Sequence, residues 1–509
     1  MKKLGFISLL IFCAAAVFFA GCGKGSGSIG EKETNKPDVP DTPTANANKY
    51  NSAKDKVLIN HEFRAVWLTT VSGLDWPNKN QTASYQIAAL KQYIQNAKNL
   101  NLNAVVMQVC CNMEAYWNSA ILPWAAQLTG TQGKDPGYDP LAIAIEECHK
   151  AGMEIHAWIN PLRCSGVSTA RADNHPYNLH PEWTQVYGST YYWDPAYQEV
   201  SDFLASIVTE LMTNYDLDGL HIDDFFYPDG LKSDEKTWDD SEMYALYGGG
   251  KSLTEWRESN INRVVKTLHT TTHATKSNAI FGVSPAGRME LTTYLYADPR
   301  QWIAEGSIDY LAPQIYWPHS HSFAGFAKVL GDWKPIALCE GDAKAVPMII
   351  GLAPYRYGET GFEKISEFFD QVDHTRGANS YTRGNLWFRA EHISATTMYN
   401  YIKSNIYPYP SLMPELKAGI LSQAPALSAP TLTLDGTTLK WNSVAGAENY
   451  AVYELSKKTT YTSGAVDWDA NLITTGGINS FKGKSQKNYV VVAYAGKKIS
   501  KISNVVFVE

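Results

Sequence analysis

The chain lacks an excess of basic residues. Its 44 lysines and arginines are outnumbered by 51 aspartates and glutamates, which gives a formal net charge of −7 over 509 residues. Proteins that bind nucleic acid usually carry a basic patch or stripe, whereas the basic residues of this chain are scattered. We therefore expect no nucleic-acid partner. With 44% hydrophobic and 19% charged residues, the composition is that of a folded protein.

Cysteines are too few and too irregularly spaced for a disulfide framework or a structural zinc site. Apart from Cys13 and Cys22 near the N-terminus, they stand at Cys110, Cys111, Cys148, Cys164 and Cys339, an odd number without metal-ligand spacing. No Gly-rich phosphate-binding loop follows the first strand of the pattern. We therefore expect neither a metal ion nor a cofactor.

The apolar run at the N-terminus is too short to span a membrane. It extends from Leu9 to Phe19, follows "MKK" and precedes "AGC", which is the pattern of an export signal. Small residues directly before Cys22 resemble a bacterial lipoprotein box, which implies a signal peptide over residues 1–22 and a lipid on Cys22. Residues 23–60 are polar and rich in Gly and Pro, so we expect a flexible tether. These features predict a lipoprotein of the bacterial cell envelope, anchored in the outer membrane and touching the membrane through its lipid alone.

Short apolar strands alternate with amphipathic helices from residue 62 onward. The strands are expected at 63–70, 103–109, 154–160, 218–223, 279–285, 308–317, 347–353 and 384–389. Helices are expected at 83–100 and after the caps Asp139-Pro140, Asp194-Pro195 and Asp298-Pro299. Eight strand–helix units predict an α/β fold, a (β/α)₈ TIM barrel over residues 61–410, with an open doubly wound sheet as the alternative.

The C-terminal residues have a different pattern. After a linker at 411–425, short alternating strands separated by turn residues predict a small all-β sandwich of fibronectin type III kind over residues 426–509. We expect this domain to serve as a spacer or to make weak glycan contacts rather than to catalyse a reaction.

The stretch "DGLHIDDFFYPDG", residues 218–230, places two adjacent carboxylates at the end of a strand. Side chains alternate along a strand, so Leu220 and Ile222 share the helix-facing side. His221 and Asp223 then point into the barrel, with Asp223 nearest the C-terminal mouth, where TIM barrels carry their sites. Asp224 follows the end of the strand and either turns toward the site or caps the next loop.

The same alternation predicts a polar interior at the mouth of the barrel. The inward set is Trp67, Thr69, Gln108, His156, Trp158, Asn160, Ser284, Gln314, Tyr316 and Arg389. An interior made for packing alone would consist of branched apolar residues, so the polar residues indicate a lined pocket or a satisfied structural network. The 15 tryptophans and 30 tyrosines suit the flat faces of sugars, although a large aromatic core would also use them.

An acidic pocket with aromatic walls fits glycoside hydrolysis. One carboxylic acid protonates the leaving oxygen and a second carboxylate acts as nucleophile or base. We predict Asp223 and then Asp224 as the catalytic residues. Neighbours on a regular strand point to opposite faces, so the two form a pair only if the strand ends before them. Otherwise the second carboxylate is one of Asp75, Glu114, Glu290 or Glu391.

Residues 62–405 resemble the glycosyl-hydrolase-like family 10 proteins, formerly a family of unknown function. The resemblance rests on "EFRAVWLTTVSGLDWP", "DPGYDPLAIAIEECHKAGMEIHAWINPLR", "LDGLHIDDFFYP", "GVSPAG" and "DYLAPQIYWP". It implies a barrel lipoprotein, and since an enteric member is understood to cleave peptidoglycan glycans stripped of their peptides, it implies that substrate. This chain departs from the family at "QVCCNMEAYW", residues 108–117, where a basic residue and Gly are common. Cys110 as a nucleophile lacks a histidine partner.

The fourth strand is also similar to that of chitinase-type barrels. Asp218, Gly219 and Asp223 match their motif, but His221 replaces an inner aspartate and Phe225 replaces the catalytic glutamate. That mechanism does not transfer directly, although either aspartate could orient an N-acetyl group of the substrate.

The expected substrate-binding residues lie at or just beyond the strand ends. They are Trp67, Asp75, Trp76, Gln108, Asn160, Arg163, His221, Tyr227, Gln314, Tyr316 and Trp317. Arg163 is placed to meet a carboxylate such as that of muramic acid, or is a surface residue. For His221 the alternative is a barrel-core histidine, and for Trp76 and Trp317 it is loop packing. A hydrolase of plant or host polysaccharides and a non-catalytic glycan-binding lipoprotein are the competing functions, and the oligomeric state stays open.

Overall fold

The computed structural model describes residues 48–231, 238–339, 344–416 and 427–509. The expected signal peptide and the lipidation site at Cys22 lie outside the described residues. Within them, no helix is both long enough and apolar enough to cross a membrane.

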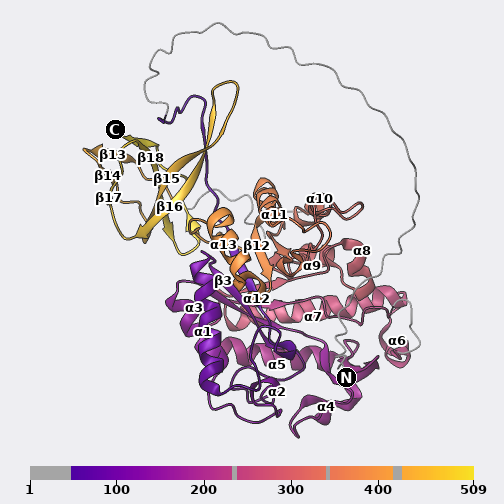
Figure 1. Cartoon of the computed structure of the whole chain (residues 1–509). Helices are drawn as coiled ribbons and strands as arrows, with labels where there is room; N and C mark the ends of the chain where they lie inside the picture. Colours follow the sequence, from indigo (N-terminus) through magenta and orange to yellow (C-terminus); the bar gives the residue numbers. More distant parts are fainter. Residues whose placement is uncertain (1–47, 232–237, 340–343, 417–426) are drawn as a thin grey trace, which may run out of the picture. The chain divides into compact units, whose positions relative to one another are not determined.

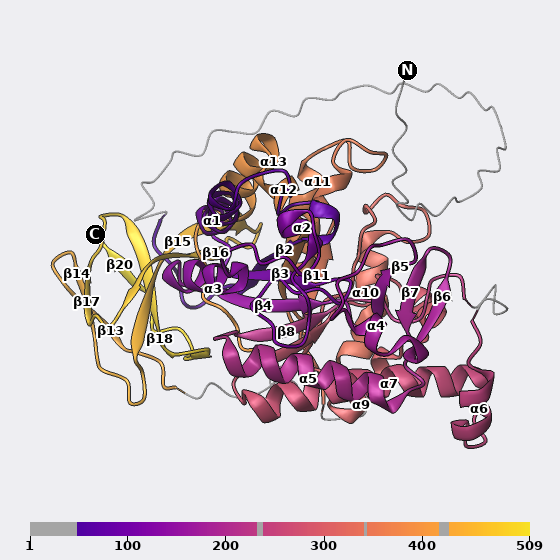
Figure 2. The same cartoon turned by 90° about the horizontal axis from the view of Figure 1, so that it is seen from below.

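Eight parallel strands form a closed barrel, which confirms the predicted TIM barrel (Figures 1 and 2). Around the barrel the strands follow the order β10-β11-β12-β2-β3-β4-β8-β9. Their bounds are β2 Phe63–Leu68, β3 Ala104–Cys110, β4 Glu154–Ile159, β8 Gly219–Ile222, β9 Ile280–Val283, β10 Tyr310–Leu311, β11 Met348–Leu352 and β12 Thr382–Phe388. Each of the eight predicted strands therefore supplies one barrel strand, in the predicted sequence order.

The largest departure from the predicted strands is at β10. We expected a strand over 308–317, but β10 ends at Leu311. Pro313 has no N–H to donate to a neighbouring strand, so the ladder stops there. Gln314 returns to the sheet only through isolated bridges to Ala286 and Gly351.

Helices follow the barrel strands and cover the outside of the barrel (Figure 2). The longer ones are α1 Ala83–Asn99, α3 Pro140–Lys150, α5 Gln198–Asn214, α7 Leu253–Thr275, α10 Phe326–Ala337 and α11 Ser366–Gly377, with α9 Pro299–Glu305 beside them. The short ones are α2 Ala126–Thr129, α4 Pro176–Leu179, α6 Ser241–Tyr247, α8 Met289–Thr292, α12 Ala390–Ser394 and α13 Thr396–Tyr401.

Two of the three predicted helix caps are present. Asp139 accepts a hydrogen bond from the Ala142 N–H, and Asp298 accepts from two N–H groups of α9. The cap predicted at Asp194-Pro195 is wrong, because α5 begins only at Gln198. The Asp194 carboxylate instead accepts from the Ala196 N–H in a turn before the helix.

The strand alternation divides the buried residues of most barrel strands as predicted. In β12 the prediction is wrong: an inward Arg389 required an inward Trp387, but Trp387 lies in the outer core near Phe368 of α11, and Leu386 lies inside. Inside the barrel lie Phe63, Ala65, Trp67, Ala104, Val106, Trp158, Ile280, Tyr310, Ile349 and Leu386. The outer core, against the helices, includes Val66, Leu68, Ile155, Ala157, Ile159, Leu220 and Ile222. The side-chain period of two is thus realised in β2, β4 and β8.

A small antiparallel sheet follows β4 and was not predicted. It contains β5 Arg163–Gly166, β6 Thr184–Tyr187 and β7 Thr190–Trp193 in the order β5-β7-β6. Arg163 begins this sheet at the mouth of the barrel, so the insertion carries a predicted substrate-binding residue.

The C-terminal strands form two sheets. One has the order β1-β16-β15-β18-β19 with β20 paired to β18, and the other the order β13-β14-β17. The bounds are β13 Leu432–Asp435, β14 Thr438–Trp441, β15 Asn449–Thr460, β16 Val466–Gly476, β17 Ser480–Lys482, β18 Lys487–Ala495, β19 Lys498–Ile499 and β20 Val506–Val508. Leu439, Trp441, Tyr450, Val491 and neighbouring side chains fill the core of this domain.

The strand β1, Lys56–Leu58, belongs to the C-terminal sheet although it precedes the barrel in sequence. It pairs in parallel with β16, with Val57 opposite Trp468. These residues lie in the stretch 23–60 that we expected to be tether, so part of that stretch belongs to the folded C-terminal sheet. Alternation over three residues is too short a pattern to identify a strand.

Candidate active site

The two adjacent aspartates lie just beyond the end of β8. The strand ends at Ile222, so Asp223 and Asp224 follow it at the C-terminal mouth of the barrel. The alternation of side chains no longer applies to them. The strand thus ends before the two aspartates, as we required for them to form a catalytic pair. Catalytic residues of TIM barrels come from this end of the strands.

The Asp223 carboxylate is buried and held by two donors. Its side chain is 3% exposed. The Trp158 indole N–H donates to Oδ2 at 3.1 Å, and the Asn160 amide donates to the same oxygen. Both donors come from β4 and the residue after it, the strand next to β8 in the barrel. The other oxygen, Oδ1, receives only a long hydrogen bond of 3.4 Å from the Phe225 N–H.

A directed chain of hydrogen bonds orients the Asn160 amide. The backbone N–H groups of Thr70 and Val71 donate to Gln108 Oε1 at 2.9 and 2.8 Å. That contact fixes the Gln108 amide, whose N–H donates to Asn160 Oδ1 at 2.7 Å. The Asn160 NH₂ group must then face Asp223. Gln108 therefore acts on the carboxylate indirectly, through Asn160.

The environments of the two aspartates differ. Burial, and then the negative charge of Asp224, raise the pKa of Asp223 to about 8, while Arg163 and the N–H donors offset part of the rise. Burial also raises the pKa of Asp224, but a hydrogen bond from the Gln314 amide at 3.1 Å limits it to about 6. At neutral pH the site therefore holds one protonated and one mostly ionised carboxyl group.

Arg163 lies near both aspartates. Its guanidinium sits over the Phe225 ring at 3.9 Å, and its positive charge offsets part of the rise in the pKa of each carboxyl. The side chain is half-buried, so it remains within reach of a ligand at the mouth.

His221 lies below the aspartates, fully buried in the barrel interior. The Trp67 indole N–H donates to its Nε2 at 3.3 Å, and Ser284 Oγ contacts the same nitrogen at 3.1 Å. Its Nδ1 therefore carries the proton and donates to the Tyr310 hydroxyl at 2.9 Å. Burial, and then His156, hold the pKa of His221 well below its usual value, so the ring is neutral.

The hydrogen-bonded chain continues to the opposite end of the barrel. The Tyr310 hydroxyl contacts His156 Nδ1 at 3.2 Å, and His156 Nε2 contacts Glu154 at 3.3 Å. Lys497, in the turn between β18 and β19, pairs with that glutamate at 2.7 Å. The polar interior predicted from the alternation is thus a satisfied network in its lower part, and only its upper part faces the mouth.

Aromatic rings line the mouth beside the aspartates. Tyr316 lies 5.9 Å from the Phe388 ring and 6.1 Å from Tyr355, measured between ring centroids. Phe388 also contacts Trp67 at 5.8 Å. Tyr316, Tyr355 and Phe388 are half-buried, so each presents part of a ring to the mouth.

Other predicted site residues lie in packed or paired positions. Asp75 accepts hydrogen bonds from Thr69 and pairs with Arg389 at 2.6 Å, and its side chain has no exposed surface. Trp76 is buried, and its indole donates to the Gln86 carbonyl. Tyr227 is also buried, against the Trp238 and Tyr296 rings. Trp317 is half-buried, and its carbonyl accepts from Gln371.

The remaining candidates for a second carboxylate have different surroundings. Glu114 is buried and accepts from the Ala126 N–H and the Gln132 amide, and burial raises its pKa. Glu290 is 68% exposed and lies 3.4 Å from Arg288. Glu391 pairs with Arg389 and is 55% exposed. Cys110 is 1% exposed, and burial raises the pKa of its thiol to about 12.

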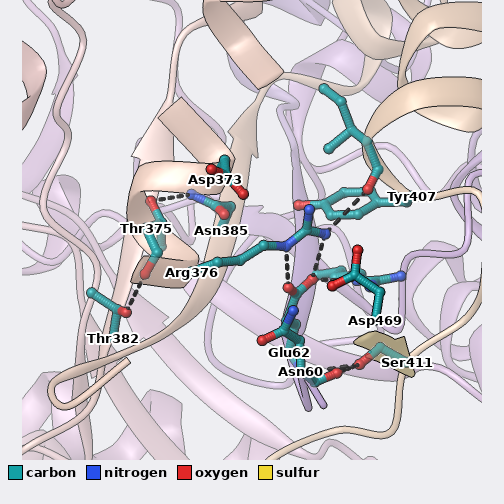
Figure 3. Close-up of polar contacts among 12 residues, drawn as sticks. Asn60, Glu62, Asp373, Thr375, Arg376, Thr382, Asn385, Tyr407, Ser411 and Asp469 are labelled. Carbon is teal, nitrogen blue, oxygen red and sulfur yellow. Dashed lines mark hydrogen bonds and ion pairs between the residues drawn. The ribbon is translucent and has the colours of Figure 1, made fainter. Parts of the chain in front are cut away.

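A hollow of about 450 Å³ lies at the other end of the barrel, where the strands begin. Its lining includes Glu62, Arg376, Arg383, Lys497 and Lys498. Figure 3 shows the Arg376 side chain reaching Glu62 there, with Tyr407 and Asp469 nearby. The starts of TIM-barrel strands serve stability rather than catalysis, so we place the active site at the mouth.

Known proteins similar to this chain include glycosyl hydrolases. Residues 62–368 match the model of the glycosyl hydrolase-like 10 family. The chain is 33% identical over 382 residues to glycosyl hydrolase YngK of Bacillus subtilis, covering 70% of this chain and 74% of that protein. The chain belongs to the glycosyl hydrolase-like 10 family. It is also 35% identical over 332 residues to glycosyl hydrolase DigH of Escherichia coli K12, covering 58% of this chain and 74% of the relative.

Solved structures similar to this glycosyl hydrolase-like 10 protein include two glycoside hydrolase domains. One is the glycoside hydrolase domain of PgaB from Bordetella bronchiseptica, with a TM-score of 0.42 and 12% identity, covering 68% of this chain and 99% of that one. The other is the catalytic domain of β-amylase from Paenibacillus polymyxa, with a TM-score of 0.43 and 14% identity, covering 69% and 99%.

Sequence reasoning missed three aromatic residues of the mouth in this family member. Phe225 lies on a loop, Tyr355 in the short 3-10 helix Pro354–Arg356 and Phe388 at the end of β12. Phe388 had a misleading signal, since the alternation that placed Arg389 inside the barrel put Phe388 on the outward face. Tyr355 had none, because its approach to Tyr316 depends on how the loop after β11 folds.

Proposed function

We propose that this chain is a lipid-anchored glycoside hydrolase of the cell envelope, with Asp223 and Asp224 as its catalytic pair. Family membership supports a hydrolase that acts on glycans. The observation that carries the proposal is the pair of neighbouring carboxyls after β8, whose pKa values are raised to about 8 and about 6. Two carboxyls with separated pKa values are what acid and base roles require.

Asp223 acts as the general acid in this mechanism. It is protonated at neutral pH, and because Oδ2 accepts from Trp158 and Asn160, the proton belongs on Oδ1. The proton passes to the glycosidic oxygen as the bond from that oxygen to the anomeric carbon breaks. The leaving sugar departs with a free hydroxyl group.

Asp224 serves the opposite role as the ionised carboxylate. It takes a proton from the attacking water, or holds the acetamido group of an N-acetylated sugar while that group attacks the anomeric carbon. The Gln314 amide holds Asp224 in place through its 3.1 Å hydrogen bond. The anomer of the first product, followed by NMR, distinguishes the two routes.

The substrate we propose is peptidoglycan-derived glycan from which the peptides have been removed. The family resemblance implies this substrate, and Arg163 supports it. A guanidinium stacked on Phe225 beside the aspartates is suited to bind the carboxylate of a muramic acid residue. Mutating Arg163 to Gln should weaken the action on muramic-acid-containing glycans more than on chitin-type chains of N-acetylglucosamine.

The decisive experiment replaces Asp223 with Asn and measures reducing ends released from peptide-free wall glycan. We expect kcat to fall by about 10²- to 10⁴-fold, because the neutral amide cannot donate the proton. Glycan affinity should stay within a few-fold of wild type. The control is Glu290→Gln, a solvent-exposed alternative carboxylate that should leave the rate unchanged.

The competing function, a non-catalytic glycan-binding lipoprotein, predicts another outcome. Such a protein binds glycan with either residue at position 223 and releases no reducing ends in either form. Loss of turnover in Glu290→Gln would instead move the second catalytic role to that residue. A panel of plant and host polysaccharides tests the remaining alternative substrates.

We also propose that Cys22 carries the lipid and that the C-terminal sheets form a fibronectin type III-like spacer. Sheet orders β16-β15-β18 and β13-β14-β17 support the second point. Replacing Cys22 with Ser should move the protein from the membrane fraction to the soluble fraction, as followed by immunoblot. A signal-peptide variant that keeps Cys22 is the control, and an unchanged membrane fraction would contradict lipid anchoring.

A further inference from the structure

Two histidines and an aspartate converge at the end of the barrel opposite the proposed active site. His269 and His273 stand one turn apart near the C-terminal end of α7, and Asp309 directly precedes β10. Their candidate ligand atoms all lie within 4.8 Å of one another. Figure 2 shows α7 running beside α5 and α9 on the outside of the barrel.

The geometry of this group is close to what a zinc ion needs. His273 Nε2 lies 2.8 Å and His269 Nε2 lies 3.9 Å from the Asp309 carboxylate oxygens. Ligand atoms about 2.0–2.1 Å from a tetrahedral ion are about 3.3 Å apart, so movements of roughly 1 Å suffice. The histidine side chains are 20% and 25% exposed, which leaves a route for an ion.

The carboxylate is already oriented by the barrel. The Phe281 N–H donates to Asp309 Oδ2 at 2.7 Å, which fixes the carboxylate at the start of β10. Metal-ligating carboxylates are commonly held in this way by a further hydrogen bond. Two histidines at i and i+4 on a helix present their rings on one face.

A similar contact elsewhere in the barrel shows what is particular to this group. At the start of β8, Asp218 Oδ2 accepts from the Ile155 N–H at 2.9 Å and contacts His149 Nε2 at 3.0 Å. Both places thus contain a carboxylate before a strand, a backbone N–H from the neighbouring strand and a histidine from a preceding helix. The group at Asp309 adds a second histidine one helical turn earlier.

We infer that His269, His273 and Asp309 form a divalent-metal site of the zinc-binding type, which ties the end of α7 to the start of β10. The site lies among the strand starts, so its role is to stabilise the barrel and not to take part in glycan cleavage. We expected no metal ion from the sequence, where Asp309 is 36 residues from His273 and joins the histidines only through the fold.

The test uses the untagged protein after treatment with a chelator, because a histidine tag would itself bind metal. Zinc chloride is titrated in competition with a chromophoric chelator, and thermal unfolding is followed with and without zinc. We expect one Zn²⁺ per chain and a rise in Tm of roughly 3 °C at a hundredfold excess over Kd. Glycan hydrolysis should not depend on the added zinc, which separates this test from that of the proposed function.

The variant His269→Gln should weaken zinc binding at least tenfold and abolish the rise in Tm. The matched control is His149→Gln, which removes the histidine of the similar contact at Asp218 and should bind zinc like wild type. Circular dichroism checks that both variants are folded. Cobalt binding reports the donor atoms, and we expect no thiolate charge-transfer band. No saturable zinc binding, equal binding by His269→Gln, or a thiolate band would each overturn the inference.

Discussion

At the scale of single residues, the difference between Asp223 and Asp224 comes from their hydrogen-bond partners and burial. Asp223 lies deeper and also feels the negative charge of its neighbour, which raises its pKa further. Asp224 is half-buried and receives a donor from Gln314. Activity should therefore be highest between about pH 6 and about pH 8, where Asp224 is ionised and Asp223 is protonated.

Replacing Gln314 with Ala should move the acidic side of this pH profile. The Gln314 amide stabilises the ionised form of Asp224, so its loss raises the pKa of that carboxyl. We expect the acidic limb of kcat/KM to shift upward by roughly one pH unit, which is about 1.4 kcal/mol for a hydrogen bond to a charged group. The alkaline limb, set by Asp223, should stay in place and serves as an internal control. An unchanged acidic limb would remove Asp224 from the base role.

Much of the site could be predicted at this scale from the alternation of side chains. Val66 and Leu68 marked the outward face of β2, and the structure places Trp67 inside the barrel as expected. The alternation could not tell which inward residues reach the mouth. His221 satisfies the same pattern as Asp223, but it lies one layer lower and is enclosed by Trp67 and Tyr310.

At the scale of elements, a glycine in β9 leaves room in the barrel interior for a large side chain of β10. Gly282 of β9 lies opposite Tyr310 of β10. A Cβ added at Gly282 would lie 1.9 Å from Cζ of the Tyr310 ring. The ring therefore occupies the space that any other residue at position 282 would need, and from there its hydroxyl reaches both His156 and His221.

Replacing Gly282 with Ala should destabilise the protein by about 2–3 kcal/mol. The added methyl group displaces Tyr310 and breaks its two histidine contacts. Urea unfolding followed by fluorescence measures the change. The control is Gly331→Ala on the exposed side of α10, where nothing lies within 4 Å of the added carbon. That change should stabilise the protein by about 0.5–1 kcal/mol. Equal stabilities of the two variants would contradict this account of the interior.

The existence of the barrel elements was predictable, but their extent and insertions were not. Strong apolar runs identified all eight strands, because buried parallel strands leave a clear signal. The small sheet of β5, β6 and β7 contains mostly half-buried polar and aromatic residues, so it lacks such a run. The early end of β10 follows from Pro313, a residue that sequence analysis could have weighed more heavily.

At the scale of the whole molecule, Glu62 joins segments that are far apart in the sequence. It precedes β2 and pairs with Arg64 at 2.7 Å and with Arg376 at the end of α11. Arg64 also donates to the Tyr409 carbonyl, and Arg376 to the Ile406 carbonyl. Figure 3 shows this cluster with Asp469 of β16 beside it. The start of the barrel, α11 and the chain after α13 are thus held by one buried carboxylate.

Replacing Glu62 with Gln should cost about 3–5 kcal/mol at pH 7, because it leaves two arginines without their buried partner. Burial alone would raise the pKa of Glu62, but Arg64 and Arg376 outweigh it and lower the pKa to about 2. A lowered pKa gives stability that is present above the unfolded value near 4.3 and is lost as the pH falls toward 2. The difference between variant and wild type in urea unfolding should therefore shrink from pH 5 to pH 3. A difference independent of pH would contradict the ion-pair explanation.

The pairing of β1 with β16 also has a mechanical consequence. Lys56–Leu58 lie along β16 in parallel, and the Asp55 carboxylate accepts from the Val466 N–H and the Trp468 indole. Tension applied to the chain before Asn48 would reach the paired strands β1 and β16 before it reached β2. The hydrogen bonds between β1 and β16 would bear that load in shear, and the barrel would feel it only after they had failed.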